Sequence, residues 1–256
     1  MRYVAIGDSF TEGVGDELED GSLRGWPDLV AAGLAAALDE PVEYANLAVR
    51  GRLIEPIVHD QLEAALSLDP LPDLLTFNGG GNDMMRPGFG VDRVMALTEQ
   101  VAARCAEAGV RVLMLTGGDP TERLPRGAVM RDRGAEWLVA VHAFLERHPE
   151  ITFVDNWVDA ELRRPPYWSE DRLHLGPLGH ARVAARVLTA LGVPTPLPEA
   201  GDVPVSRAGA LNEARYYARY VLPWLARRVT RRSSGDGRSP KRPVWTRVDG
   251  VSSDAR

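Results

Sequence analysis

The sequence has a single cysteine, Cys105, and no long apolar run. One cysteine excludes an internal disulfide, so the composition gives no sign of an oxidising compartment. The apolar residues 3–6 near the N-terminus form far too short a run for the core of a signal peptide. No stretch approaches the roughly 18 apolar residues of a membrane span. We therefore expect a cytoplasmic protein.

Signatures of nucleotide and metal binding are also missing. The three glycines at 79–81 are not followed by Gly-Lys-Ser/Thr, so they do not form a Walker loop. No Gly-x-Gly-x-x-Gly follows the first apolar run, which argues against a dinucleotide site. The His, Cys and Asp residues show no zinc-like spacing. We expect neither a cofactor nor a metal.

Short apolar runs alternate with longer stretches of helical spacing. Strands separated by helices imply right-handed crossovers and a parallel sheet, and strands that are apolar on both faces imply helices on both sides. We predict an α/β fold: a flavodoxin-like, doubly wound, five-stranded parallel sheet with helices on both faces, ordered 2-1-3-4-5. The strands are expected at residues 2–6, 42–49, 74–77, 111–116 and 151–154, and the helices at 26–38, 54–66, 91–108, 131–147 and 178–191.

Charge is unevenly spread along the chain. From Val205 onward 12 Lys and Arg accompany 4 Asp and Glu, a local charge of +8, which leaves −14 for the residues before it. The basic part could be a solvated end, an Arg-rich helix with weak contact to an anionic membrane surface, or a non-specific nucleic-acid contact. Tyrosines and Trp224 among the arginines favour the membrane over pure solvation, and we expect no specific nucleic-acid partner. The predicted parts are a catalytic domain at 1–204, a basic helical extension at 205–232 with Pro223 inside it, and a flexible tail at 233–256.

Ser9 directly follows the first predicted strand. In doubly wound sheets ligands bind beyond the carboxyl ends of the strands, so a serine there can expose its hydroxyl to a ligand. Gly7 and Gly13 permit tight backbone geometry around it. The alternative is that Ser9 caps the following helix.

A serine nucleophile needs a base, and His174 is the histidine expected at the same edge of the sheet. It lies in the loop after the last predicted strand, and Asp171 precedes it by three residues. The carboxylate can accept a hydrogen bond from the imidazole Nδ1–H, which fixes the tautomer. The alternative is a solvated acidic loop with a chance histidine, and His180 is expected to pack or cap.

Donors for an oxyanion are expected in two other loops. Gly51 offers an unobstructed backbone N–H, and Asn82 carries an amide on a glycine-rich loop. The backbone N–H of Ser9 would complete a hole of three donors. The alternatives are turn geometry for Gly51 and a helix cap for Asn82.

Together these residues resemble a known family. Gly7-Asp8-Ser9-Phe10 is similar to the block that names the GDSL hydrolases, with Phe10 in place of the usual leucine. Gly51, Asn82 and the pair Asp171 and His174 resemble the remaining blocks of the SGNH superfamily, in the family's order. The resemblance implies Ser9 as nucleophile, His174 as base, Asp171 as its orienter, and Ser9, Gly51 and Asn82 as the oxyanion hole, with no metal.

The expected function is an esterase or lipase-like serine hydrolase acting on a small-molecule or lipid ester through an acyl-enzyme on Ser9. An acyltransferase would use the same acyl-enzyme, with an alcohol or sugar in place of water. A non-catalytic ligand-binding module is the alternative from another class. It would gain support if the serine, the histidine or an oxyanion donor were missing, and none is.

Overall fold

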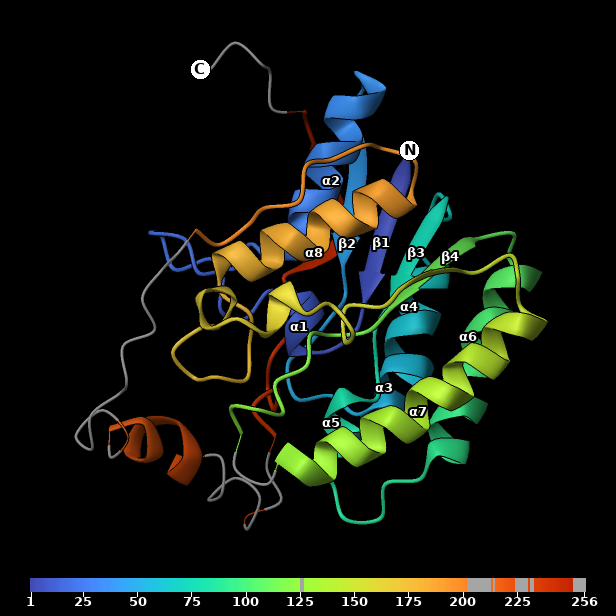
Figure 1. Ribbon diagram of the computed structural model, residues 1–256. Coiled ribbons are helices and arrows are strands. Elements are labelled where there is room, and N and C mark those ends of the chain that lie inside the picture. The colour runs from blue at the N-terminus through green and yellow to red at the C-terminus, as the bar shows by residue number, and fades with distance from the viewer. Residues whose placement is uncertain (125–126, 202–212, 214, 224–229, 231–232, 251–256) are drawn as a thin grey trace.

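The structure is a computed structural model that describes residues 1–124, 127–201, 213, 215–223, 230 and 233–250. In this part of the chain six strands form one twisted sheet, ordered β5-β4-β3-β1-β2-β6 (Figure 1). The five parallel strands are β1 (Arg2–Ile6), β2 (Val42–Asn46), β3 (Leu74–Phe77), β4 (Arg111–Leu115) and β5 (Thr152–Val154). Their order confirms the predicted doubly wound arrangement.

Helices cover both faces of the sheet because the strands are apolar on both sides. In β1, Tyr3 and Ala5 face the layer of α2 (Trp26–Leu38) and α8 (Pro177–Ala190). Val4 and Ile6 face the opposite layer. Figure 1 shows α2 and α8 side by side on one face and the second layer on the other. That second layer comprises α3 (Ile54–Pro56), a π-helix at Ile57–Leu62, α4 (Glu63–Leu66), α6 (Val91–Glu107) and α7 (Gly127–Arg147).

The prediction of five strands was wrong. A sixth strand, β6 (Arg242–Val248), pairs antiparallel with β2, so Val42 lies opposite Val248 and Asn46 opposite Arg242. The prediction of a flexible tail was therefore wrong for these residues. The proline and the charges that suggested flexibility are common in edge strands, which have one unpaired side.

Short helices occupy the loops at the carboxyl ends of the strands. They are α1 (Ser9–Glu12), α5 (Gly81–Met84), and 3-10 turns at Glu161–Arg163 and Pro165–Tyr167. The predicted extension 205–232 lies mostly outside the described residues; its described part includes a π-helical turn at Tyr217–Val221.

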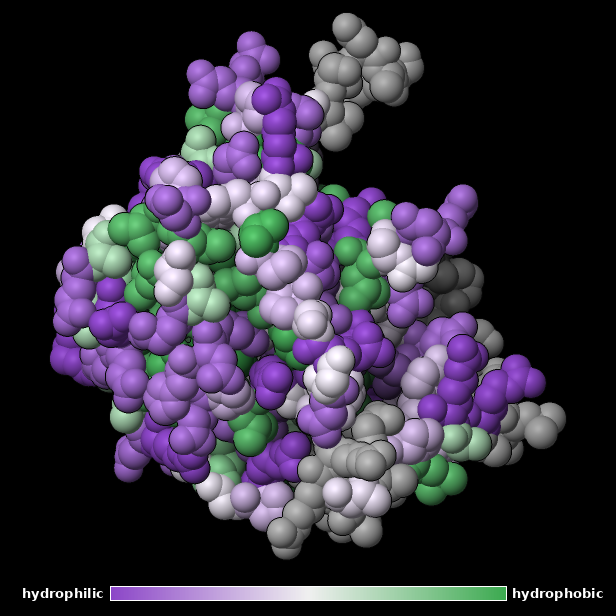
Figure 2. All heavy atoms as spheres, turned by 180° about the vertical axis from the view of Figure 1, so that it is seen from behind, coloured by the Kyte–Doolittle hydropathy of each residue, from purple (hydrophilic) through white to green (hydrophobic). Residues whose placement is uncertain are grey.

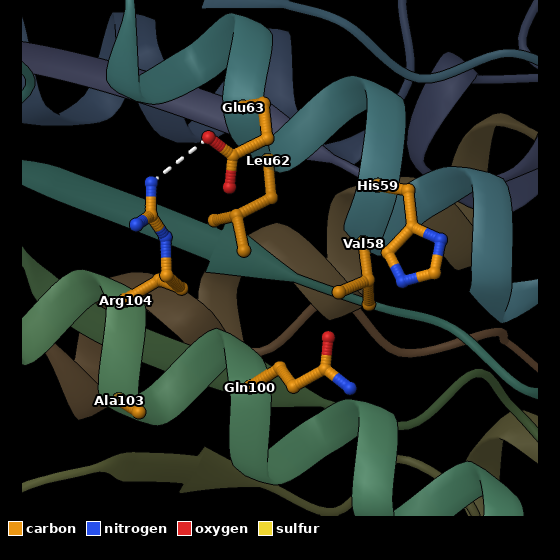
Figure 3. A pocket seen from close by; sticks show the side chains of 7 residues that line it. All are labelled: Val58, His59, Leu62, Glu63, Gln100, Ala103 and Arg104. Carbon is orange, nitrogen blue, oxygen red and sulfur yellow. Dashed lines mark hydrogen bonds and ion pairs between the residues drawn. The ribbon is translucent and has the colours of Figure 1, made fainter.

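In the described ranges no helix is both long enough and apolar enough to cross a membrane. Figure 2 shows a largely hydrophilic face on which hydrophobic side chains form separate small groups. A groove between the π-helix and α6 lies away from the strand ends, with Val58, Leu62 and Ala103 among its lining residues (Figure 3). An ion pair of 2.8 Å between Arg104 and Glu63 crosses it, so this groove is a seam between packed helices.

Candidate active site

The turn after β1 presents Ser9 as the first residue of α1. Asp8 caps that helix and accepts a hydrogen bond of 3.1 Å from the Phe10 N–H. A side chain at position 7 would bring a Cβ within 2.4 Å of Thr11 Oγ1, so the tight turn requires Gly7. Gly13 ends the helix in the left-handed conformation, with φ of 99°. The geometry around Ser9 therefore follows from the residues on either side of it.

Gln61 fixes the same turn from the opposite helical layer. Its buried amide accepts from the Gly7 N–H at 2.8 Å and donates to the Gly7 carbonyl at 3.0 Å. Gln61 thus pairs with Gly7 as a neighbouring strand would. It lies in the π-helix Ile57–Leu62, in the stretch for which the sequence predicted a continuous helix.

His174 meets Ser9 as predicted, although the two residues are 165 positions apart. His174 Nε2 lies 2.9 Å from Ser9 Oγ, and His174 Nδ1 lies 2.5 Å from Asp171 Oδ2. The loop between the 3-10 turns and α8 holds this geometry, since the Ser169 N–H donates to the His174 carbonyl at 2.9 Å. Three side chains are therefore aligned as hydroxyl, imidazole and carboxylate.

Asp171 is held by its own loop. Its Oδ1 accepts from Ser169 Oγ at 2.7 Å and from the N–H groups of Leu173 and His174 at 2.9 Å each. Burial opposes its negative charge, but hydrogen bonds and attraction from His174 outweigh burial and hold the pKa of Asp171 well below its ordinary value. The carboxylate therefore stays charged beside the imidazole.

Asn82, on α5, reaches the same site. Its Nδ2 donates to Asp8 Oδ2 at 3.1 Å and to the Arg52 carbonyl at 2.9 Å. Complete burial raises the pKa of Asp8 to about 6, although the Phe10 N–H and the attraction of His174 oppose the rise. Asn82 thus lies beside the Ser9 turn, with its amide hydrogens directed at two protein oxygens.

Gly51 lies on the neighbouring loop, in the left-handed conformation with φ of 75°. The residue before it, Arg50, forms a buried ion pair with Glu12 of α1, with Arg50 Nη2 2.7 Å from Glu12 Oε1. Glu12 also accepts from the Arg50 backbone N–H at 2.6 Å. This carboxylate therefore ties the Gly51 loop to the helix that carries Ser9.

A small cavity of about 90 Å³ opens beside Ser9. Ser9, Asn82 and His174 line it, whereas Gly51 is not among its lining residues. Its wall is mostly apolar, formed by Met84, Met85, Met130, Trp137 and Trp157 with glycines at 79, 81, 117 and 118. Shape and chemistry suit a short apolar group joined to an atom within reach of the serine.

A family model described as the GDSL-like lipase/acylhydrolase family matches residues 5–182, more than half of the chain. The chain belongs to this family. It is accordingly an ester-cleaving serine hydrolase, as the sequence predicted. A search of curated protein sequences found no match.

Solved structures of similar fold include a lipase, Lip_vut3, from a goat rumen metagenome, with a TM-score of 0.59 and 20% identity. The esterase EstA from a Pseudoalteromonas species gives 0.58 and 16%. Axe2, an acetylxylan esterase from Geobacillus stearothermophilus, gives 0.57 and 18%. The alignments cover 74%, 75% and 75% of this hydrolase and 97%, 96% and 94% of those chains, respectively. About a quarter of the present chain therefore has no counterpart in them.

On the sequence alone, Trp26, Trp137 and Trp168 are candidates for the core or for the pocket wall, and Trp168 is preferred because it is close to the loop of Asp171 and His174. Trp168 does not line the cavity: its indole N–H donates to the Leu162 carbonyl at 2.6 Å, and its ring packs against Gly118. Trp137 and Trp157 line the cavity in its place. Trp157 lies in the loop after β5, where ligand contacts were expected, whereas Trp137 lies within α7, and no local pattern marks Trp157 as a wall residue.

His180 packs, as expected. It is fully buried, its Nδ1 accepts from the Trp26 N–H at 3.2 Å, and its Nε2 lies 3.2 Å from the Val14 carbonyl. Burial lowers the pKa of His180 to about 4. Among the described residues no group of three or more His, Cys, Asp or Glu side chains has the arrangement of a metal site.

Proposed function

We propose that this hydrolase cleaves carboxylic esters through an acyl-enzyme on Ser9. The observation that carries the proposal is the 2.9 Å contact between Ser9 Oγ and His174 Nε2, with Asp171 bound to the other imidazole nitrogen. His174 takes the hydroxyl proton while Ser9 attacks the ester carbonyl. The same imidazole then protonates the leaving alcohol. Water attacks the acyl-enzyme in a second round of the same steps.

The oxyanion formed in each round needs donors, and we propose the N–H groups of Ser9 and Gly51 with the Asn82 amide. Asn82 lines the cavity, which supports its part. Because its two amide hydrogens go to Asp8 and Arg52, Asn82 must redirect one of them toward the oxyanion. The bond to Asp8, at 3.1 Å, is the longer of the two.

We further propose that the acyl group is short. The cavity of about 90 Å³ is small beside the ~300–1,000 Å³ of typical ligand pockets, which favours a short acyl group. The methionine and tryptophan wall favours an alkyl chain over a polar one. We expect acetyl to butyryl esters to be preferred over octanoyl esters.

A serine-directed fluorophosphonate probe followed by mass mapping tests the nucleophile. We expect the label on Ser9 and none on the Ser9→Ala variant; a label on another serine contradicts the assignment. A series of p-nitrophenyl esters tests the acyl chain, with kcat/KM expected to fall at least tenfold from butyrate to octanoate. Met130→Ala, which enlarges the cavity, should shift the optimum to longer chains. Met95→Ala, which leaves the cavity wall unchanged, should not.

We also propose that the basic extension touches anionic membranes weakly. In its described part Arg219, Tyr217 and Leu222 are exposed, a combination that suits a lipid headgroup region. Flotation with phosphatidylserine vesicles, compared with neutral vesicles, tests this; equal recovery in both contradicts it. The cytoplasmic location stays a prediction, which cell fractionation tests.

A further inference from the structure

The residues from Ser233 to Val248, here called the C-terminal strap, follow the matched region 5–182 and end in β6. The strap crosses from the loops at the carboxyl end of the sheet to its edge, where β6 pairs with β2 (Figure 1). It therefore extends the sheet of this hydrolase beyond the part that defines the family.

Charged side chains anchor the strap to α2. Lys241 Nζ lies 2.6 Å from Asp28 Oδ2 and donates to the Leu23 carbonyl at 3.2 Å. Arg242 Nε lies 3.3 Å from the other oxygen of Asp28. Both Lys241 and Asp28 are largely buried, so this end of the strap is fixed to the body of the protein.

The other end of the strap packs directly on the Gly51 loop. Ser233 Oγ donates to the Gly51 carbonyl at 3.2 Å. A Cβ added to Gly235 would lie 2.1 Å from the Arg50 carbonyl oxygen, and one added to Gly51 would lie 2.4 Å from Ser233 Oγ. Only glycines permit an approach as close as this on both sides.

The Gly51 loop is thus held from two sides. Glu12 binds Arg50 from the helix of the nucleophile, as described above. The strap contacts the other side of the same loop, where Ser233 lies against Gly51 and Gly235 lies against Arg50. We propose that Ser233 and Gly235 are positioning residues, which hold the Gly51 N–H where the oxyanion forms; this rests on the proposed function of Gly51.

Gly235→Ala should lower kcat by moving the Gly51 N–H. The new methyl group forces the Arg50 carbonyl away, since it would otherwise approach to 2.1 Å, and this displaces the adjoining Gly51 N–H. Loss of an oxyanion donor costs about 10²- to 10³-fold in kcat. A displaced donor should therefore cost about 10- to 100-fold in kcat, with KM changed less than about threefold.

Gly250→Ala is the matched control. Its Cβ would lie 2.8 Å from Ala36 Cα on α2, so it crowds the same C-terminal part without contacting the Gly51 loop. We expect it to lower the melting temperature and leave kcat unchanged. Ser233→Ala removes one hydrogen bond and should lower kcat about two- to fivefold without preventing folding.

The test measures kcat, KM, melting temperature and affinity for an alkylboronic acid, whose tetrahedral adduct places an oxygen in the oxyanion position. In Gly235→Ala we expect kcat and boronic acid affinity to fall together. Unchanged kcat, or reduced kcat with unchanged boronic acid affinity, overturns the proposal. If Gly235→Ala does not fold, Ser233→Ala decides by the same two measurements. If Ser9→Ala is inactive and Gly235→Ala has normal activity, the positioning role of the strap is refuted and the proposed function stands. If Ser9→Ala is active, the proposed function itself is refuted.

Discussion

Replacing Asp171 with asparagine should nearly abolish turnover while leaving the fold intact. Three donors converge on Oδ1 of Asp171, from Ser169 Oγ and from the backbone N–H groups of Leu173 and His174. An asparagine must place its carbonyl oxygen there to satisfy them. Its NH2 group then replaces Oδ2 and points at His174 Nδ1. The imidazole can accept that hydrogen bond only as the Nε2–H tautomer, which cannot take the proton of Ser9.

The expected loss is about 10⁴-fold in kcat, the effect of the same substitution in a serine protease triad, which corresponds to about 5.5 kcal/mol of barrier. Because the three bonds to Oδ1 survive, the free energy of unfolding should change by less than about 2 kcal/mol. Hydrolysis of p-nitrophenyl butyrate and chemical denaturation measure the two quantities. Ser169→Ala, which removes one Oδ1 donor only, is the control and should retain most activity. Turnover of the Asp171→Asn variant within tenfold of the original enzyme would refute the tautomer argument.

Three buried titratable groups, Glu12, Asp8 and His180, give further predictions. Glu12→Gln leaves Arg50 without a counter-ion and should lower the free energy of unfolding by about 3 kcal/mol, measured by denaturation; a change below about 1 kcal/mol contradicts a buried pair. The raised pKa of Asp8, about 6 against 3.8, favours folding at low pH, and this contribution is lost as pH rises from 3.8 through 6. The shift in pKa amounts to about 3 kcal/mol. As pH rises from 4 to 6.5, the free energy of unfolding of Asp8→Asn should therefore rise by about that much relative to the original enzyme. The pKa of His180 is lowered, to about 4 against 6.5, so its effect on stability runs the other way. The stability that the neutral imidazole contributes is lost as pH falls from 6.5 toward 4. Over that pH range His180→Gln should therefore lose about 3 kcal/mol less free energy of unfolding than the original enzyme, measured by denaturation at each pH. The same dependence of the free energy of unfolding on pH in both proteins contradicts the shift.

Most of the sheet could be predicted because its strands are short, mostly apolar and separated by helices. The predicted bounds of β1 and β3 match the observed ones. The site loops followed from the rule that ligands lie beyond the carboxyl ends of parallel strands. That rule alone predicts Ser9, Asn82 and His174 at one edge of the sheet.

The remaining features depend on contacts that no local pattern encodes. β6 has no clear alternation of buried and exposed residues, and next to it Lys241 forms a largely buried pair with Asp28, 213 residues away in the sequence. The clamp of Gln61 on Gly7 needs a π-helical turn, which shares the apolar spacing of an ordinary helix. The cavity wall requires that Trp137 of α7 and Trp157 of the loop after β5 converge, which only the packed structure determines.

The turn after β1 explains why a motif that is weak in isolation is informative in context. Within six residues, four have separate distant partners: Gly7 binds Gln61, Asp8 binds Asn82, Ser9 meets His174 and Glu12 binds Arg50. A substitution in this turn therefore disturbs a loop elsewhere as well as its own residue. Residues that share a network of contacts couple by about 0.5–3 kcal/mol. Glu12→Gln and Asp8→Asn should accordingly be non-additive in kcat, because Asp8 and Glu12 lie at the two ends of the same four-residue helix and each holds one of the loops of the proposed oxyanion donors.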